Sequence, residues 1–276
     1  MLGRNIIKTV TGGEEMTVKI AIIGGTGVYD PNILENIHEE QLETEYGRTL
    51  VKIGEYKGKK VAFMARHGAD HSVPPHLVNY RANIAGLKQL GVKNIFATAA
   101  VGSLNQSMKA EDFVFVDQFL DFTKVRKHTF FEGGENGVVH LDVTDPYCPE
   151  LRRLLMEVSG NLGLTAHNGG TYVCTEGPRF ETPAEIRMFA RLGGDLVGMT
   201  SVPEVVLARE VQMCYATICM VTNYAAGIAE YKLSHQEVVE VMSKNVANLR
   251  RLIMETIESL EEGRTCSCQI SHVDPV

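Results

Sequence analysis

Short apolar runs separated by glycine and polar residues recur along the chain, and most have the length of a buried strand. The runs that predict strands are 18–23, 50–53, 61–65, 94–99, 113–117, 170–174, 195–198 and 214–221. Gly58-Lys59-Lys60 separates the second run from the third, so this pair predicts a hairpin.

Helical periodicity occupies most of the intervals between these runs. The predicted helices are 78–90, 149–162, one that begins at Thr182-Pro183, 203–211 and 234–260. Gly91 ends the first, and Ser234 with Glu237 forms a capping box for the last. Strands that alternate with helices and are apolar throughout predict an α/β fold, with a largely parallel sheet covered on both faces.

The chain shows no internal repeat, low-complexity tract or linker, which predicts one domain over residues 18–262. Residues 1–17 are predicted to be an N-terminal extension, since Met16 stands directly before the first strand. Residues 263–276 form a C-terminal tail. Segment 124–147 is rich in glycine, charge and aromatic residues and predicts a long surface excursion, the kind of loop that often carries function.

The composition narrows the class of protein. With 276 residues, 44% of them hydrophobic, the chain is long enough for one domain with a full core. A net charge of −7 disfavours a nucleic-acid partner. No apolar run reaches the roughly 20 residues that span a bilayer, and the N-terminus lacks the apolar core of a secretory signal. We therefore expect a cytoplasmic protein that binds neither membrane nor nucleic acid.

Six cysteines divide into two groups. Four lie in or beside apolar segments, where cysteine usually packs as a small hydrophobic residue: Cys148, Cys174, Cys214 and Cys219. Cys266 and Cys268 lie in the polar tail. They are either two exposed thiols at a frayed end or a pair that is redox-active or cross-linking, although disulfides are uncommon inside cells.

Six candidate residues lie at or just after the ends of predicted strands: Thr26, Arg66, Ala99, Phe180, Thr200 and Asn223. The carboxyl ends of parallel strands line one crevice, so we expect these positions to lie together. The turn at 24–27 is either a tight strand exit or an anion site, because consecutive glycines let backbone N–H groups close on an anion. Arg66 and His67 favour anion binding, since arginine donates several hydrogen bonds in one plane.

Two more segments supply candidates for the same crevice. In Glu176-Gly177-Pro178-Arg179-Phe180, the phenylalanine can stack on a planar ring, and the glutamate and arginine can hold each other or a ligand. Met199 suits an apolar sugar face, although core packing is the alternative. His67, His71 and His76 suggest a metal site, but two intervening prolines break any helix that would align them, so we expect no metal.

Taken in order, seven segments resemble one family. They are GGTG (24–27), RHG (66–68), GSL (102–104), VDQFLDFT (116–123), EGPRFET (176–182), GMTSVPEVVLARE (198–210) and TNYAA (222–226). Over 18–260 the chain resembles the methylthioadenosine phosphorylase/purine nucleoside phosphorylase family, and in particular its 6-oxopurine nucleoside phosphorylase branch. The resemblance implies a single α/β domain with a distorted, mixed sheet, and a homotrimer or homohexamer.

The resemblance also implies roles. Thr26, Arg66, His67 and Thr200 would bind phosphate, with the backbone N–H of Ala99 where methylthioadenosine enzymes carry a threonine. Around the nucleoside, Met199 would pack under the ribose, Phe180 would flank the base, and His140 would lie near the ribose 5′ end. Asn223, Arg66 and His67 would be the catalytic residues.

Asn223 and Ala225 determine the expected base. Both positions are aspartate in adenine-specific relatives, and a carboxylate repels a 6-oxo group, whereas an amide can donate to it. We therefore expect phosphorolysis of inosine or guanosine to free base and ribose 1-phosphate in purine salvage. Phosphate is a co-substrate, and no cofactor is expected.

Three alternatives remain open at this stage. A methylthioinosine or methylthioadenosine phosphorylase would need an apolar 5′ pocket, and His140 leans toward a 5′-hydroxyl instead. A dinucleotide-binding protein would use the glycine turn, but its usual G-x-G-x-x-G is absent. A non-catalytic purine-binding module would bind inosine without turning it over.

Overall fold

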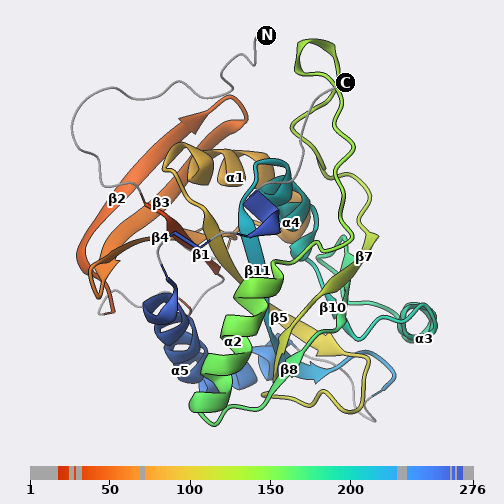
Figure 1. Ribbon diagram of the computed structural model, residues 1–276. Coiled ribbons are helices and arrows are strands. Elements are labelled where there is room, and N and C mark those ends of the chain that lie inside the picture. Colours follow the sequence, from red (N-terminus) through yellow and green to blue (C-terminus); the bar gives the residue numbers. More distant parts are fainter. Residues whose placement is uncertain are drawn as a thin grey trace, which may run out of the picture.

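The computed structural model describes residues 18–24, 28, 33–68, 72–228, 235–261, 263–264 and 266–269. Within these residues eleven strands form one mixed sheet with helices on both faces (Figure 1). The strands are β1 Ile20–Gly24, β2 Glu35–Thr44, β3 Gly47–Tyr56, β4 Lys59–Ala65, β5 Asn94–Ser103, β6 Phe113–Phe115, β7 Gln118–Phe122, β8 Ala166–Asn168, β9 Thr171–Thr175, β10 Leu196–Gly198 and β11 Cys214–Tyr224. The predicted α/β class is confirmed.

Five α-helices in the described residues cover the sheet: α1 Tyr80–Gln89, α2 Pro149–Asn161, α3 Pro183–Arg191, α4 Ser201–Glu210 and α5 His235–Ser259. Helices α2 and α5 lie side by side on one face, and α1 with α4 covers the other (Figure 1). The side chains of β1 alternate between the faces, since Ile20 and Ile22 pack with α2 and α5 whereas Ala21 and Ile23 pack with α1 and α4.

Strands β5 and β11 form the centre of the sheet. They run parallel over almost their whole length, and β1 is parallel to β5 on its other side. Beyond Val101 the edge of β5 also pairs with β10, which continues to β9 and β7. The carboxyl ends of β1, β5 and β11 therefore meet at one end of the sheet, where an α/β protein binds its ligand.

One predicted boundary is wrong in a way that affects the site. Strand β5 continues through Ala99 to Ser103, four residues further than predicted, so Ala99 lies inside the strand. Small residues follow Ala99 in the strand, and Gly102 lies close to Ala225, just after β11. The backbone of β5 can therefore stay extended between its two partner strands, β11 and β10. Strand β7 was also missed as a separate element.

The predicted start of α3 and the predicted loop 124–147 agree with the structure. Thr182 caps α3 in a capping box with Glu185, as the Thr-Pro start indicated. The capping box predicted from Ser234 and Glu237 lies outside the residues whose side chains are described. Excursion 124–147 contains only one short 3₁₀ turn, at Gly134–Asn136, which agrees with its prediction as a loop.

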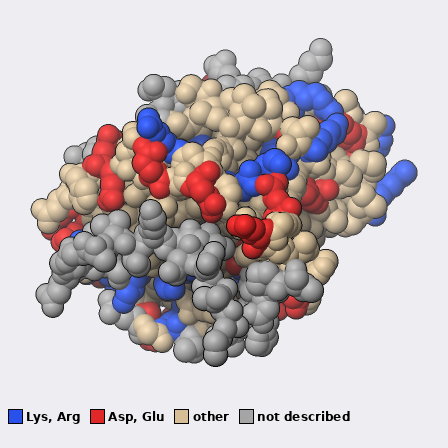
Figure 2. All heavy atoms as spheres, turned by 90° about the horizontal axis from the view of Figure 1, so that it is seen from above, with Lys and Arg blue, Asp and Glu red and all other residues tan. Residues whose placement is uncertain are grey.

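The surface shows mixed charge where it is described. On the face in Figure 2, acidic and basic side chains alternate, and the described residues there form no broad basic area. None of the described helices combines the length and apolar character that crossing a membrane requires.

Candidate active site

The candidate site begins where β1 and β4 end side by side. Gly24 is in register with Ala65, and the backbone N–H of Arg66 donates to the Gly24 carbonyl at 3.1 Å. Arg66 therefore leaves the sheet next to the glycine turn, as its place after a strand predicted. Thr26, the turn's own candidate, lies outside the described residues.

Arg66 is buried in an ion pair with Glu204 of α4. Its Nε and Nη2 donate to the two carboxylate oxygens at 2.7 Å each, and Nη1 donates to the Thr98 carbonyl at 2.9 Å. Arg66 is only 4% exposed and Glu204 is fully buried. Arg66 is therefore a buried group rather than a surface charge, and Glu204 holds one edge of its planar guanidinium in place.

The pair sets the protonation and the orientation of the guanidinium. Burial alone would lower the pKa of Arg66, but the charge and hydrogen bonds of Glu204 outweigh it and hold the pKa above its ordinary value. Three of the five N–H donors of Arg66 are used by Glu204 and Thr98, which leaves two for a ligand. Tyr215 donates a further hydrogen bond to Glu204 at 2.7 Å and fixes the carboxylate.

The other predicted phosphate ligands lie around this pair. His67 is buried, and its Nδ1 lies 2.9 Å from the Val73 carbonyl; because a carbonyl only accepts, Nδ1 carries a proton. Thr200 is buried immediately before α4, the helix that carries Glu204, and its backbone N–H donates to the Tyr172 hydroxyl at 3.3 Å. A Cβ at Gly198 would collide with that same hydroxyl, so the chain needs glycine there to place Thr200.

At the carboxyl end of β11, the Asn223 amide is held at both of its atoms. Its Oδ1 lies 2.7 Å from the Thr222 hydroxyl, and its Nδ2 donates to the Tyr224 carbonyl at 2.9 Å. Asn223 is 6% exposed. The amide keeps one N–H and one lone-pair direction for a ligand, so it can donate and accept at the same time.

Ala225 closes the apolar wall beside this amide. It is buried in a small cluster with Val197 and Leu104, and its N–H donates to the Ser103 carbonyl at 2.8 Å. Asn223 pairs with Gly102, and Gly102 pairs with Val197 of β10, so the amide and the Met199 segment come from the two strands that flank the end of β5.

The loop from Glu176 to Phe180 packs against Met199. A Cβ at Gly177, whose φ is +66°, would come within 2.6 Å of the Met199 sulfur, so only glycine permits this approach. Phe180 is 43% exposed and is available to a planar ligand. Arg179 pairs with Glu185 at 2.7 and 2.9 Å, so Glu176 and Arg179 do not hold each other.

Two buried charged residues of this region were not singled out in the sequence. Glu204 is one, and Arg126 of the surface excursion is the other. Arg126 donates to the carbonyls of Val202, at 2.6 Å, and Glu176, at 2.8 Å, and so ties the ligand loop to the start of α4. A charged residue in a polar loop gives no sign of burial, although Arg126 is 8% exposed.

Some predicted residues stay apart. His140 is exposed on the irregular segment before α2, and no hydrogen bond among the described residues joins it to the other candidates. His71 lies outside the described residues, so the alternative of a three-histidine metal site is left untested.

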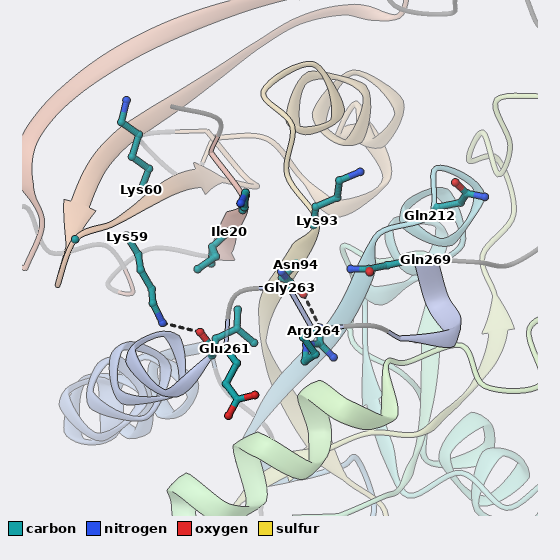
Figure 3. Close-up of a pocket in the computed structure, with 13 residues that line it drawn as sticks. Ile20, Lys59, Lys60, Lys93, Asn94, Gln212, Glu261, Gly263, Arg264 and Gln269 are labelled. Carbon is teal, nitrogen blue, oxygen red and sulfur yellow. Dashed lines mark hydrogen bonds between the residues drawn. The ribbon is translucent and has the colours of Figure 1, made fainter. Parts of the chain in front are cut away.

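Two cavities mark the ends of the sheet. One of about 210 Å³ lies beside the candidate site and is lined by Glu176, Gly177 and Arg179 among others. A larger one, about 450 Å³, lies at the amino ends of β1 and β5 and is lined by Lys19, Lys93 and Arg264 (Figure 3). It contains none of the predicted site residues.

Comparison with known proteins finds a matching family model and close relatives of known name. A family model described as the phosphorylase superfamily matches residues 19–258. A probable 6-oxopurine nucleoside phosphorylase of Moorella thermoacetica is 61% identical, covering 92% of this chain and 98% of that protein. The 6-oxopurine nucleoside phosphorylase of Pyrococcus furiosus is 53% identical over 91% of this chain and 96% of its own length.

Solved structures agree with this. A methylthioadenosine phosphorylase from an Antarctic soil metagenomic library superposes with a TM-score of 0.87 at 37% identity, covering 92% of this chain and 91% of the other. Curated relatives also include an S-methyl-5′-thioadenosine phosphorylase of Thermofilum pendens, 50% identical over 91% of this chain and 95% of that protein.

Proposed function

Because the chain belongs to the phosphorylase superfamily, we propose that it cleaves 6-oxopurine nucleosides with phosphate, yielding the free base and ribose 1-phosphate. One observation carries the choice of base: the buried end of β11 presents the amide of Asn223 beside the methyl group of Ala225. No carboxylate stands at either position. A 6-oxo group only accepts, so it needs the amide N–H that Asn223 retains.

The phosphate half of the reaction uses the Arg66 region. Phosphate binds to the two remaining Arg66 N–H donors, to His67 and Thr200, to the backbone at Ala99 and to Thr26. Glu204 neutralises the formal charge of Arg66, so hydrogen-bond direction rather than net charge places the phosphate oxygen below C1′. Glu204 is a positioning residue, because it acts through Arg66.

The leaving base uses the Asn223 region. As the C1′–N9 bond lengthens, the sugar gains oxocarbenium character and the purine gains negative charge, which spreads toward N7 and O6. A preorganised amide N–H stabilises that charge without reorganising, because Thr222 and Tyr224 already hold the side chain. Met199 packs under the ribose, Phe180 flanks the base, and His140 is the candidate residue for the ribose 5′ end.

A methylthioinosine phosphorylase is the second candidate, since it would read the same base. A probable S-methyl-5′-thioinosine phosphorylase of Methanothermobacter thermautotrophicus is 50% identical to this chain. The two candidates differ only at the 5′ position, where a thiomethyl group needs an apolar pocket and a hydroxyl needs a hydrogen-bond partner.

The experiment is a substrate panel with phosphate: inosine, guanosine, adenosine, methylthioadenosine and methylthioinosine. We expect kcat/KM for inosine or guanosine to exceed that for adenosine by about tenfold or more, the effect of one mismatched buried hydrogen bond. A preference for either 6-amino substrate would refute the assignment of Asn223. Preference for methylthioinosine over inosine would support the second candidate. We propose a cytoplasmic homotrimer or homohexamer, which light scattering distinguishes.

A further inference from the structure

Four of the six cysteines meet at the amino end of β11, opposite the candidate active site. We call Cys148, Cys214, Cys266 and Cys268 the thiol cluster. All four sulfur atoms lie within 4.8 Å of one another. They come from three segments: the residue before α2, the first residue of β11, and a Cys-x-Cys at the 3₁₀ turn Ser267–Gln269.

The thiol cluster is buried. Cys148 and Cys214 are fully inaccessible, and the two tail cysteines are no more than 7% exposed. The interpretation of Cys266 and Cys268 as exposed thiols is therefore wrong. All six cysteines of the chain are free in the structure, and the contact from Cys148 to Cys266 is 3.4 Å from sulfur to sulfur.

This spacing is that of metal ligands around a shared centre. Four thiolates at the usual Zn–S length of about 2.3 Å in a tetrahedron have sulfur atoms about 3.8 Å apart. One disulfide joins only two of the four sulfur atoms, at about 2.05 Å, and two disulfides would divide the four into two separate pairs. Four sulfur atoms gathered mutually, rather than in two separate pairs, favour one central ion.

The surroundings suit negative charge on the sulfur atoms. Cys148 is the N-cap of α2, where the helix dipole favours a thiolate, and the Leu151 N–H donates to its sulfur at 3.5 Å. Arg264 reaches the same sulfur with Nη1 at 3.8 Å. Its Nη2 donates to Asn94 at 2.6 Å (Figure 3). This hydrogen bond fixes the guanidinium, whose other end reaches the Cys148 sulfur.

We propose that the thiol cluster binds one Zn²⁺ as a tetrahedral tetrathiolate. Each thiol gives its proton to solvent as the metal binds, so four S–H bonds are replaced by four Zn–S bonds and the site carries a net charge of −2. Arg264 offsets part of that charge, and the large cavity beside it is lined by four lysines: Lys19, Lys59, Lys60 and Lys93.

The site is structural rather than catalytic. Four protein ligands leave no open position for water or substrate. The ion would join the segment after α5 to α2 and to β11, the central strand of the sheet. Since unfolding separates these three segments, metal binding stabilises the folded chain.

The test measures metal in the full-length chain, purified under reducing conditions without a metal-affinity tag. Elemental analysis should give about one zinc per chain. Cobalt added to metal-free, reduced protein should produce the visible absorption of a tetrahedral tetrathiolate. Chelation should lower Tm by about 5 °C or more, and zinc alone should restore it.

Cys268→Ser, which removes one ligand, should lose most of the zinc, and Cys219→Ser is the matched control. Cys219 is equally buried on β11 but lies outside the thiol cluster, so its variant should keep full metal. Circular dichroism establishes that each variant is folded, and the cobalt spectrum of the unmodified chain decides the matter if Cys268→Ser does not fold.

Reduced protein that binds neither zinc nor cobalt would overturn the proposal. So would iron found in place of zinc, or a disulfide between cluster cysteines when protein is alkylated directly in cell lysate. Equal metal loss in both variants would show that burial of cysteine, rather than ligation, sets the metal content.

Discussion

The two ends of β11 carry polar sites of opposite design. Asn223 lies at the carboxyl end of β11 and Arg66 follows the carboxyl end of β4, and each of these groups keeps hydrogen-bonding capacity for a ligand. At the amino end, about 30 Å away for a strand of this length, the four thiols lie against one another, with Arg264 and the Leu151 backbone N–H beside the Cys148 sulfur. A site that must turn over leaves donors open, whereas a site that holds the fold together closes them.

Arg66→Ala should show the largest effect and act on the carboxyl end only. Loss of charged hydrogen bonds should lower kcat/KM for phosphate by about 10- to 150-fold. Steady-state kinetics with varied phosphate measures this. Stability should also fall, because Glu204 is left as a buried charge without its partner, at a cost of about 3–5 kcal/mol.

A second variant separates these effects. Arg66→Ala combined with Glu204→Gln removes the unpaired charge, so it should recover much of the stability and none of the phosphate affinity. Recovery of phosphate kinetics in that double variant, or an unchanged phosphate dependence in Arg66→Ala alone, would remove Arg66 from the phosphate site.

The carboxyl end was largely predictable because one positional rule covers it. Arg66 and Thr200 each follow a buried strand, and Asn223 lies near the end of β11, which runs to Tyr224 rather than ending at Val221 as predicted. The sheet gathers such positions whatever their separation in sequence. The partners Glu204 and Arg126 escaped because their burial depends on packing between a helix and a loop. Nothing in a charged residue's neighbours along the chain reports that packing.

The thiol cluster at the amino end could not be predicted, because no positional rule brings its four cysteines together. Cys148, Cys214 and the tail pair belong to no known ligand spacing, and the tail itself looks polar. Only the fold shows that the chain returns after α5 to the start of β11. The extra length of β5 was missed because Gly102 and the small residues before it do not have the pattern of a buried strand, although small residues suit a strand that changes partners.

The second prediction concerns base choice at the same carboxyl end. Asn223→Asp with Ala225→Asp should move the ratio of kcat/KM for adenosine over inosine upward by about tenfold or more, since each carboxylate repels O6 and one accepts from a 6-amino group. Asn223→Asp alone should mainly lose activity. The absolute rates of the double variant should be low, because Ala225 is 1% exposed and a carboxylate there is costly to bury.

Initial rates with both nucleosides at saturating phosphate measure the ratio. An unchanged ratio would show that other residues select the base, and Asn223 and Ala225 would then have no role in base recognition. A control is Cys219→Ser on the same strand, which should leave the ratio where it is.

The smallest expected effect belongs to Arg264→Ala at the amino end. This substitution removes the 2.6 Å hydrogen bond to Asn94 and the contact with the Cys148 sulfur. A net loss of about 1 kcal/mol corresponds to a Tm lower by about 2–4 °C. The kcat and KM for inosine should stay within twofold of the unmodified values, because almost the whole length of β11 separates Arg264 from Asn223. Differential scanning calorimetry and the inosine assay on one preparation measure the two quantities together. A larger change in kcat with little change in Tm would mean that the two ends of the strand are coupled, and that the thiol cluster serves the reaction as well as the fold.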